Sequence, residues 1–163
     1  MNIFRQVLIK CYRLLFFAYI GSNDQKAAKY AHKAAQLGSA WGQNQYGNIL
    51  VKGIGVAKTE HEAVKWYRKA ANQEFLWAEA NMGWCYLEGI GVDLDYAQSA
   101  IWYKKAAEKG HAESQYNLGL AYVDGYGVKQ NQQEGEKWLK FAEKKGIAEA
   151  TLVLKKLQTI QQA

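Results

Sequence analysis

The stretch YLEGIGVDLDYAQSAIWYKKAAEKG, residues 86–110, decides the fold because the chain repeats its pattern. The pattern stands 36 residues earlier as LVKGIGVAKTEHEAVKWYRKAANQE, residues 50–74, and 36 residues later as YVDGYGVKQNQQEGEKWLKFAEKKG, residues 122–146. Repetition at such an interval is typical of stacked supersecondary units, none of which buries its apolar face alone. We therefore expect an all-α solenoid, a superhelix of helix–turn–helix repeats.

Each repeat predicts two helices joined by the glycine-rich loop. The second helix of the pair should begin near residues 24, 60, 96 and 132. Good N-cap residues stand directly before these starts: Asn23, Thr59, Asp95 and Asn131. Glu62, Gln98 and Glu134 follow three residues after the last three caps, so we expect capping boxes in which their side chains reach back to the cap amide.

The first helix of each pair is predicted over residues 40–52, 76–88 and 112–124. Gly47, Gly83 and Gly119 lie in its middle, where glycine costs about 1 kcal/mol relative to alanine. We interpret this cost as a steric need for close approach by another helix backbone. Lys155 takes the glycine position in the final segment, so the stack is expected to end there in a polar-faced capping helix.

The loop glycines should allow positive φ and a tight reversal of the chain. A phosphate-binding loop is the alternative, but GIGV follows a helix and lacks the Lys-Ser/Thr ending of that motif. The second helix of each pair should stop at Gly38, Gly110 and Gly146. Glu74 takes this place in one copy, so we expect the turn there to be strained or differently built.

The N-terminal segment, residues 1–22, has two interpretations. Its basic residues and short apolar run suit a secretory signal cleaved after Ser22, which would make the protein periplasmic or secreted. They also suit a capping helix that covers the first repeat, in a cytoplasmic protein. The run is too short to span a membrane. Residues 23–163 form the repeat domain under either interpretation.

The repeats closely resemble the Sel1-like repeat family, relatives of the tetratricopeptide repeat. The matching elements are NMGWCYLEGIGV (81–92), NLGLAYVDGYGV (117–128), AVKWYRKAA (63–71) and AIWYKKAAEKG (100–110), and the resemblance covers about residues 23–150. It implies a right-handed α-solenoid whose first helices line a concave groove. It also implies an adaptor or scaffold, with many members in bacteria. One branch of the family carries a cysteine pair per repeat, whereas this chain has only Cys85 within its repeats.

Composition and motifs argue against catalysis. The chain has no proline and a net charge of +6 without a dense basic block, so nucleic acid is not an expected partner. The three histidines occupy different columns of the repeat, and Cys85 lies in a column that indicates packing. We find no acid–base pair and no metal-ligand pattern, and expect no enzyme activity, no cofactor and no small-molecule substrate.

The candidate binding surface is a stripe on each first helix, opposite the glycine column. Its residues are Trp41, Gln45, Asn48 and Lys52, then Trp77, Asn81, Trp84 and Glu88, then Glu113, Asn117, Leu120 and Asp124. Most of these positions differ between copies, unlike the core columns, as a recognition surface would. Exposed tryptophans are favoured interface anchors, and the amides of Gln45, Asn81 and Asn117 can bond a peptide backbone. The alternative is a structural role, in which these side chains pack between helices.

These features predict a protein-binding module whose partner is an extended segment or a folded surface. Two alternatives remain at this point. The chain could be a bacterial immunity protein that neutralises a secreted toxin through the same groove. It could instead be a membrane-associated assembly factor anchored by its N-terminal segment, although membrane contact is not favoured.

Overall fold

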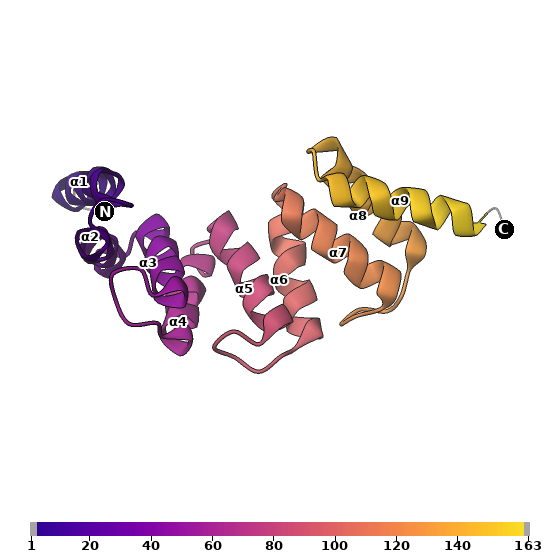
Figure 1. Cartoon of the computed structure of the whole chain (residues 1–163), viewed down its shortest axis with the longest axis horizontal. Coiled ribbons are helices and arrows are strands. Elements are labelled where there is room, and N and C mark those ends of the chain that lie inside the picture. Colours follow the sequence, from indigo (N-terminus) through magenta and orange to yellow (C-terminus); the bar gives the residue numbers. More distant parts are fainter. Residues whose placement is uncertain (1–2, 162–163) are drawn as a thin grey trace. The chain divides into compact units, whose positions relative to one another are not determined.

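The computed structural model describes residues 3–161, and within this range every regular element is a helix (Figure 1). The helices are α1 (Ile3–Tyr19), α2 (Asp24–Gln36), α3 (Ala40–Lys52), α4 (Glu60–Ala71), α5 (Leu76–Glu88), α6 (Tyr96–Glu108), α7 (Ala112–Asp124), α8 (Gln132–Lys144) and α9 (Ala148–Gln161). We call α3, α5 and α7 the A helices, and α2, α4, α6 and α8 the B helices. The all-α repeat fold is confirmed.

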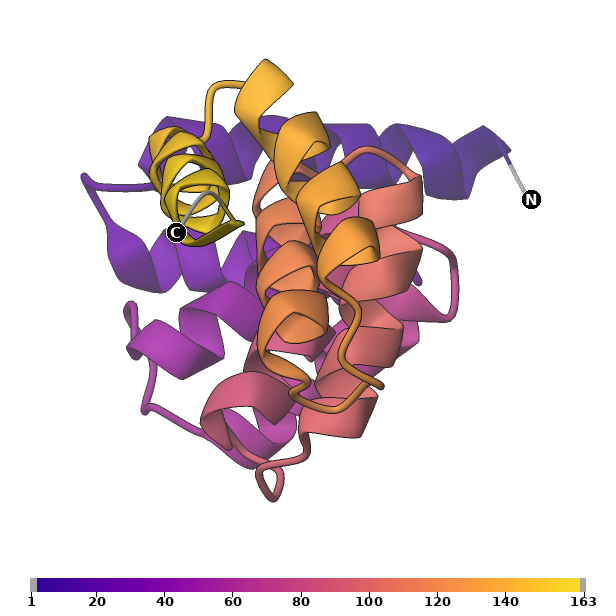
Figure 2. The ribbon, with the colours of Figure 1, turned by 90° about the vertical axis from the view of Figure 1, so that its right-hand side faces the viewer.

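The chain divides into two compact units. Unit 1 comprises the residues up to Ala78 together with Ile90–Val92, and unit 2 comprises Glu79–Gly89 together with Asp93 onwards. Within each unit, helices pack on their neighbours along the chain. Figure 2 shows this for α7 and α8, which lie side by side in unit 2 and are joined by the loop of residues 125–131.

The predicted helix limits are confirmed at both ends. The A helices occupy the predicted ranges, and the B helices begin at the predicted residues. Asn23, Asp95 and Asn131 accept a hydrogen bond from the backbone N–H three residues on, at 3.0–3.1 Å. Thr59 precedes α4 without a side-chain cap bond. The period therefore places the helix starts even where the cap bond is missing.

The predicted capping boxes are wrong in one respect. The side chain three residues after the cap does not accept from the cap's backbone N–H, because that N–H already has another acceptor. The backbone N–H of Thr59, Asp95 and Asn131 donates to the carbonyl of Leu50, Tyr86 and Tyr122 respectively, at 2.8–3.0 Å. These acceptors are themselves 36 residues apart. Glu62 accepts instead from the indole of Trp66. Each of these cap residues therefore ties the start of its B helix to the preceding A helix.

The prediction that another helix backbone approaches each mid-helix glycine is wrong for two of the three. A side chain of the B helix packs against Gly47 and Gly83 instead. A Cβ on Gly47 would lie 2.5 Å from the Tyr67 ring, and one on Gly83 would lie 2.6 Å from the Tyr103 ring. Only the third hairpin brings backbones together: a Cβ on Gly119 would lie 2.8 Å from Leu139 and 3.1 Å from the carbonyl oxygen of Gly135. Glycine is needed because the B helix inserts a large side chain against the A helix.

The second glycine of each loop has positive φ, as predicted, and also a packing role. Gly55, Gly91 and Gly127 have φ of 67°, 65° and 72°. A Cβ on each would collide with a backbone carbonyl in the first turn of a B helix, at Asp24, Glu60 and Tyr96 respectively. The loop therefore lies directly on that first turn. The strained turn at Glu74 is confirmed as well, since its φ is 59°.

The two terminal segments are helical where the structure describes them. Helix α1 packs on α2, with Phe16 buried and the Arg5 guanidinium donating to the carbonyl of Leu37 at 2.6 Å. At the other end, α9 packs on α8 through Ala150 and Leu154, while Lys155 is exposed. The predicted small, buried role of Cys85 is confirmed, since its side chain is fully buried.

Candidate functional site

The first copy of the predicted stripe lies on α3, and its amides bond within the protein. The Asn48 side-chain amide donates to the side-chain oxygen Oε1 of Gln45 at 3.0 Å. The hydroxyl of Tyr67, from α4, donates to the Asn48 oxygen at 2.8 Å. Lys52, at the end of the same helix, is exposed. The polar groups in the middle of this copy therefore hold α3 to α4.

Trp41, also on α3, is packed against α1. Its ring lies edge-on to Phe16 with centroids 5.3 Å apart, and 5.7 Å from the ring of Phe17. The guanidinium of Arg13 lies 5.3 Å from the Trp41 ring centroid. The side chain is half-buried. This geometry agrees with the alternative that Trp41 packs between neighbouring helices.

The second copy lies on α5 and differs in exposure along the helix. Trp77, which belongs to unit 1, is 54% exposed. In unit 2, Asn81 and Trp84 are half-buried and Glu88 is exposed. Trp84 packs against the buried cluster that contains Tyr103 and Leu118. Trp77 is therefore the most accessible of the three predicted tryptophan anchors.

The third copy, on α7, lines a pocket of about 190 Å³ in unit 2. Asn117, Leu120 and Asp124 contribute to its wall, whereas Glu113 at the start of the helix does not. Ala121 of α7 also lines it, and the remaining lining residues come from α5, α6 and the loop after α7: Leu87, Tyr96, Ser99, Ala100, Tyr103 and Tyr126. The structure thus brings three predicted residues together with groups from a B helix.

The pocket follows from local sequence differences between copies. Ala100 stands where the preceding copy has Val64, so the α6 wall is smaller by two methyl groups. The Ser99 hydroxyl donates to the carbonyl of Gly83 at 2.8 Å and so faces its own hairpin. Because Gly127 lets the loop lie on α6, Tyr126 comes within 5.3 Å of Tyr96, centroid to centroid. These two exposed rings form one rim.

Tyr103 also lines this pocket and is the residue that sequence reasoning missed. Its side chain is 5% exposed. The counterpart Tyr67 donates to Asn48, but Trp84 replaces that asparagine in the next copy. Burial raises the pKa of Tyr103, and the charge of Glu88 raises it further, so the hydroxyl keeps its proton.

A signal for Tyr103 was present in the sequence. Tyr67 and Tyr103 stand 36 residues apart, and their A-helix neighbours change from asparagine to tryptophan between the copies. A buried tyrosine whose partner is lost in the next repeat is a polar group without an assigned acceptor. This signal could be used only if the contact between Tyr67 and Asn48 was known, and the repeat period alone does not predict that contact.

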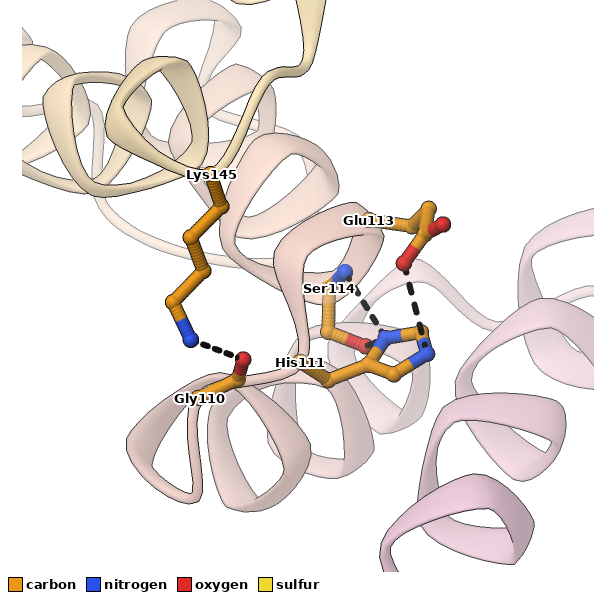
Figure 3. A network of polar contacts seen from close by, with 5 residues as sticks. All are labelled: Gly110, His111, Glu113, Ser114 and Lys145. Carbon is orange, nitrogen blue, oxygen red and sulfur yellow. Dashed lines mark hydrogen bonds and ion pairs between the residues drawn. The ribbon is translucent and has the colours of Figure 1, made fainter.

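A second polar network surrounds His111 at the start of α7 (Figure 3). Its Nδ1 accepts from the backbone N–H of Ser114 at 3.2 Å and lies 2.9 Å from the Ser114 hydroxyl. Its Nε2 lies 3.4 Å from a Glu113 carboxylate oxygen. The ammonium of Lys145 donates to the carbonyl of Gly110.

This His–Ser pair is a helix cap and not a nucleophile with its base. Ser114 is fully buried, so no substrate reaches its hydroxyl. The imidazole satisfies the first turn of α7 in the way that Ser39 does for α3, where the hydroxyl accepts from Gly42 at 3.2 Å. Burial lowers the pKa of His111, Lys145 lowers it further, and Glu113 acts in the opposite direction.

No group of three or more His, Cys, Asp or Glu side chains in residues 3–161 could hold a metal ion. Over the same part of the chain, no helix has the length and apolar character needed to cross a bilayer.

Comparison with known proteins identifies the repeat. The Sel1 repeat matches residues 12–39, 42–75, 78–111 and 112–147. The first matched repeat thus begins inside the N-terminal segment and includes the end of α1 and all of α2. None of the curated proteins matches the chain.

Several solved structures are similar. A protective antigen present in uropathogenic Escherichia coli strains, which displays an SLR fold, is 31% identical with a TM-score of 0.84, covering 92% of this chain and 32% of the antigen. A Sel1 repeat protein from Oxalobacter formigenes is 35% identical with a TM-score of 0.84, covering 94% and 63%. Helicobacter pylori cysteine-rich protein B, at 23% identity and a TM-score of 0.63 over 82% and 99%, shows the fold alone.

The chain spans about a third of the antigen's length and somewhat under two thirds of the Oxalobacter protein's. The four matched repeats cover most of residues 12–147, and the paired A and B helices are the units that they describe. The chain therefore belongs to the Sel1 repeat family.

Proposed function

We propose that the chain is a non-enzymatic interaction protein whose A helices bind a protein partner along the predicted stripe. Sel1 repeat proteins in general mediate protein–protein interaction. The observation that carries the proposal is the pocket of unit 2, because three stripe residues chosen from the sequence, Asn117, Leu120 and Asp124, line it. A concave, largely apolar pocket with a few polar groups is a typical recognition feature.

The accessible aromatic side chains support the same interpretation. Tyr126 is 57% exposed beside the pocket, and Trp77 presents a large indole surface in unit 1. Tyrosine and tryptophan bury much area at low entropic cost, so they are frequent anchors of protein interfaces.

The test is affinity capture with a matched pair of variants. The full chain is immobilised and the proteins retained from the host lysate are identified, with wild type, Leu120→Arg and the control Phe141→Arg compared in parallel. Leu120 lines the pocket, whereas Phe141 is a partly exposed apolar residue of α8 away from it. We expect the Leu120 variant to lose a partner that the Phe141 variant keeps. Equal capture by all three proteins would refute the assignment to this surface.

A second candidate, attachment to a membrane surface, is favoured by α1. Ile3, Val7 and Leu14 are 82%, 51% and 70% exposed, and their spacings of four and seven residues place them on one side of the helix. Lys10 lies on the same side between Val7 and Leu14, Arg5 and Arg13 lie elsewhere on α1, and the helix has no acidic residue. An exposed apolar stripe with basic neighbours is typical of helices that lie in the interface of anionic bilayers.

Vesicle flotation tests this candidate. The full chain is mixed with vesicles of phosphatidylcholine alone or with phosphatidylglycerol, and Leu14→Asp is compared with Leu152→Asp. Leu152 is an equally exposed leucine on α9, so it controls for loss of surface hydrophobicity. Membrane attachment predicts flotation with the anionic vesicles that only the Leu14 change abolishes. Failure of the wild type to float excludes it.

A further inference from the structure

The pocket of unit 2 contains groups that match a particular kind of side chain. Tyr103, whose side chain is more than nine-tenths buried, lines it and carries a hydroxyl. Asn117 and Asp124 add an amide and a carboxylate to the wall. Each of these groups offers an oxygen that can accept a hydrogen bond.

The charge near the pocket is negative. Asp124 lines it, and Glu88 is close enough to Tyr103 for its charge to raise the pKa of that hydroxyl. No lysine, arginine or histidine is among the lining residues, all of which lie in the described part of unit 2. An anionic or strongly polar ligand would meet these two carboxylates and is therefore disfavoured.

The shape and the remaining walls suit an aliphatic stem. Leu87, Leu120 and Ala100 form an apolar wall around a volume of about 190 Å³. The rings of Tyr96 and Tyr126 lie at one rim, where an aromatic face attracts a cation. A lysine has a flexible four-carbon stem that ends in a compact ammonium with three donors.

We propose that this pocket receives a lysine side chain of the protein partner, with its stem against Leu87 and Leu120 and its ammonium at the carboxylate of Asp124. The inference rests on the proposed function, because it names the partner chemistry for the same surface.

The test is a titration of the isotope-labelled full chain with blocked amino acids, followed by NMR. The probes are N-acetyl-lysine methylamide, N-acetyl-arginine methylamide and N-acetyl-norleucine methylamide, which has the same stem as lysine without the charge. Butylammonium serves as a free amine without peptide groups. The signals are the side-chain amide of Asn117 and the backbone amides of Leu120 and Tyr103.

We expect the lysine probe to shift these signals with an affinity about fivefold higher than the norleucine probe, as one screened ion pair allows. Asp124→Asn should abolish this preference. Asp93→Asn, which removes an exposed carboxylate outside the pocket, should leave it unchanged.

Each other outcome overturns the inference in its own way. Equal or tighter binding of norleucine shows an apolar pocket without preference for a cation. Tighter binding of arginine shows a different occupant, and tighter binding of butylammonium shows a site for a free amine and not for a residue. If no probe shifts the signals at its highest soluble concentration, the pocket takes no basic side chain. The capture experiment tests the interaction function separately, since a partner lost with Leu120→Arg would stand in all of these cases.

Discussion

At the scale of single residues, the contact between Gly83 and Tyr103 sets how closely an A helix and its B helix pack. A Cβ on Gly83 would lie 2.6 Å from Cδ1 and 2.8 Å from Cε1 of the buried Tyr103 ring. We predict that Gly83→Ala lowers the free energy of unfolding by about 1–3 kcal/mol, since the cost of overpacking exceeds the helix propensity gained. Urea denaturation followed by circular dichroism measures it. The same change in a Tyr103→Ala background should cost nothing further, and an equal loss in both backgrounds would contradict the steric explanation.

Glu74 is the other residue whose conformation has a measurable cost. Its φ of 59° lies in the left-handed region, where other copies of the repeat place Gly38, Gly110 or Gly146. We predict that Glu74→Gly raises the free energy of unfolding by about 1 kcal/mol, because glycine adopts this conformation without a Cβ clash. Gly146→Ala is the matched reverse change, since no atom lies within 4 Å of its added Cβ. It should lower stability by a similar amount; no change in either variant would show that the turn is unstrained.

At the scale of the helix, the caps of the B helices separate side-chain from backbone contributions. Asn131 accepts from the N–H of Glu134 through its side chain, whereas Thr59 makes no such bond. The N–H of each cap residue donates to the preceding A helix. We predict that Asn131→Ala costs about 1 kcal/mol of stability and Thr59→Ala clearly less. Thermal melts of the two variants decide it, and equal losses would mean that the side-chain bond contributes nothing.

The cap of α7 should make stability depend on pH through His111. Burial holds the pKa of His111 below its ordinary value, so the folded state favours the neutral ring whose Nδ1 accepts from Ser114. The unfolded state therefore takes up the proton more readily. The stabilisation is complete above the ordinary histidine pKa and declines as the pH falls below it towards the folded value.

We therefore predict that wild type loses more stability between pH 7 and pH 5 than His111→Ser does. Serine is a fair replacement because Ser39 caps α3 in the same position. Urea unfolding at the two pH values measures the difference. Carboxylates away from His111 contribute equally to both proteins, so the gap between them reports on His111 and its contact with Glu113. Identical pH dependence would show that the imidazole is not held neutral.

At the scale of the whole molecule, the repeat period made most of the fold predictable. An interval of 36 residues states which side chains occupy equivalent places, so helix limits, caps and loop glycines could be located without a structure. It does not state what lies between helices. The Tyr67 ring against Gly47 was therefore mistaken for a helix backbone.

The pocket was half predictable for the same reason. Asn117, Leu120 and Asp124 share one face of one helix and follow from its periodicity. Tyr103 and Tyr126 reach the pocket from a B helix and a loop. Their positions in the pocket depend on residues that differ between copies, notably Ala100 in place of Val64 and Trp84 in place of Asn48. Differences between repeats follow no period, so their positions relative to one another can be read only from a structure.

The division into successive hairpins also predicts how the molecule loses structure. In a repeat protein each element contacts only its neighbours along the chain, so stability is close to a sum of local terms. Leu139 of α8 is fully buried between α7 and α9. We predict that Leu139→Ala costs about 2–5 kcal/mol locally and removes amide protection from hydrogen exchange in α7, α8 and α9.

Protection in α3 and α4 should remain, because those helices make their own hairpin in unit 1. Hydrogen exchange followed by mass spectrometry resolves the two regions in one experiment. Tyr67→Ala, the matched change in unit 1, should give the opposite pattern, since this ring packs on Gly47. If either substitution removes protection evenly from α2 to α9, the chain unfolds as one cooperative body and local additivity fails for this protein.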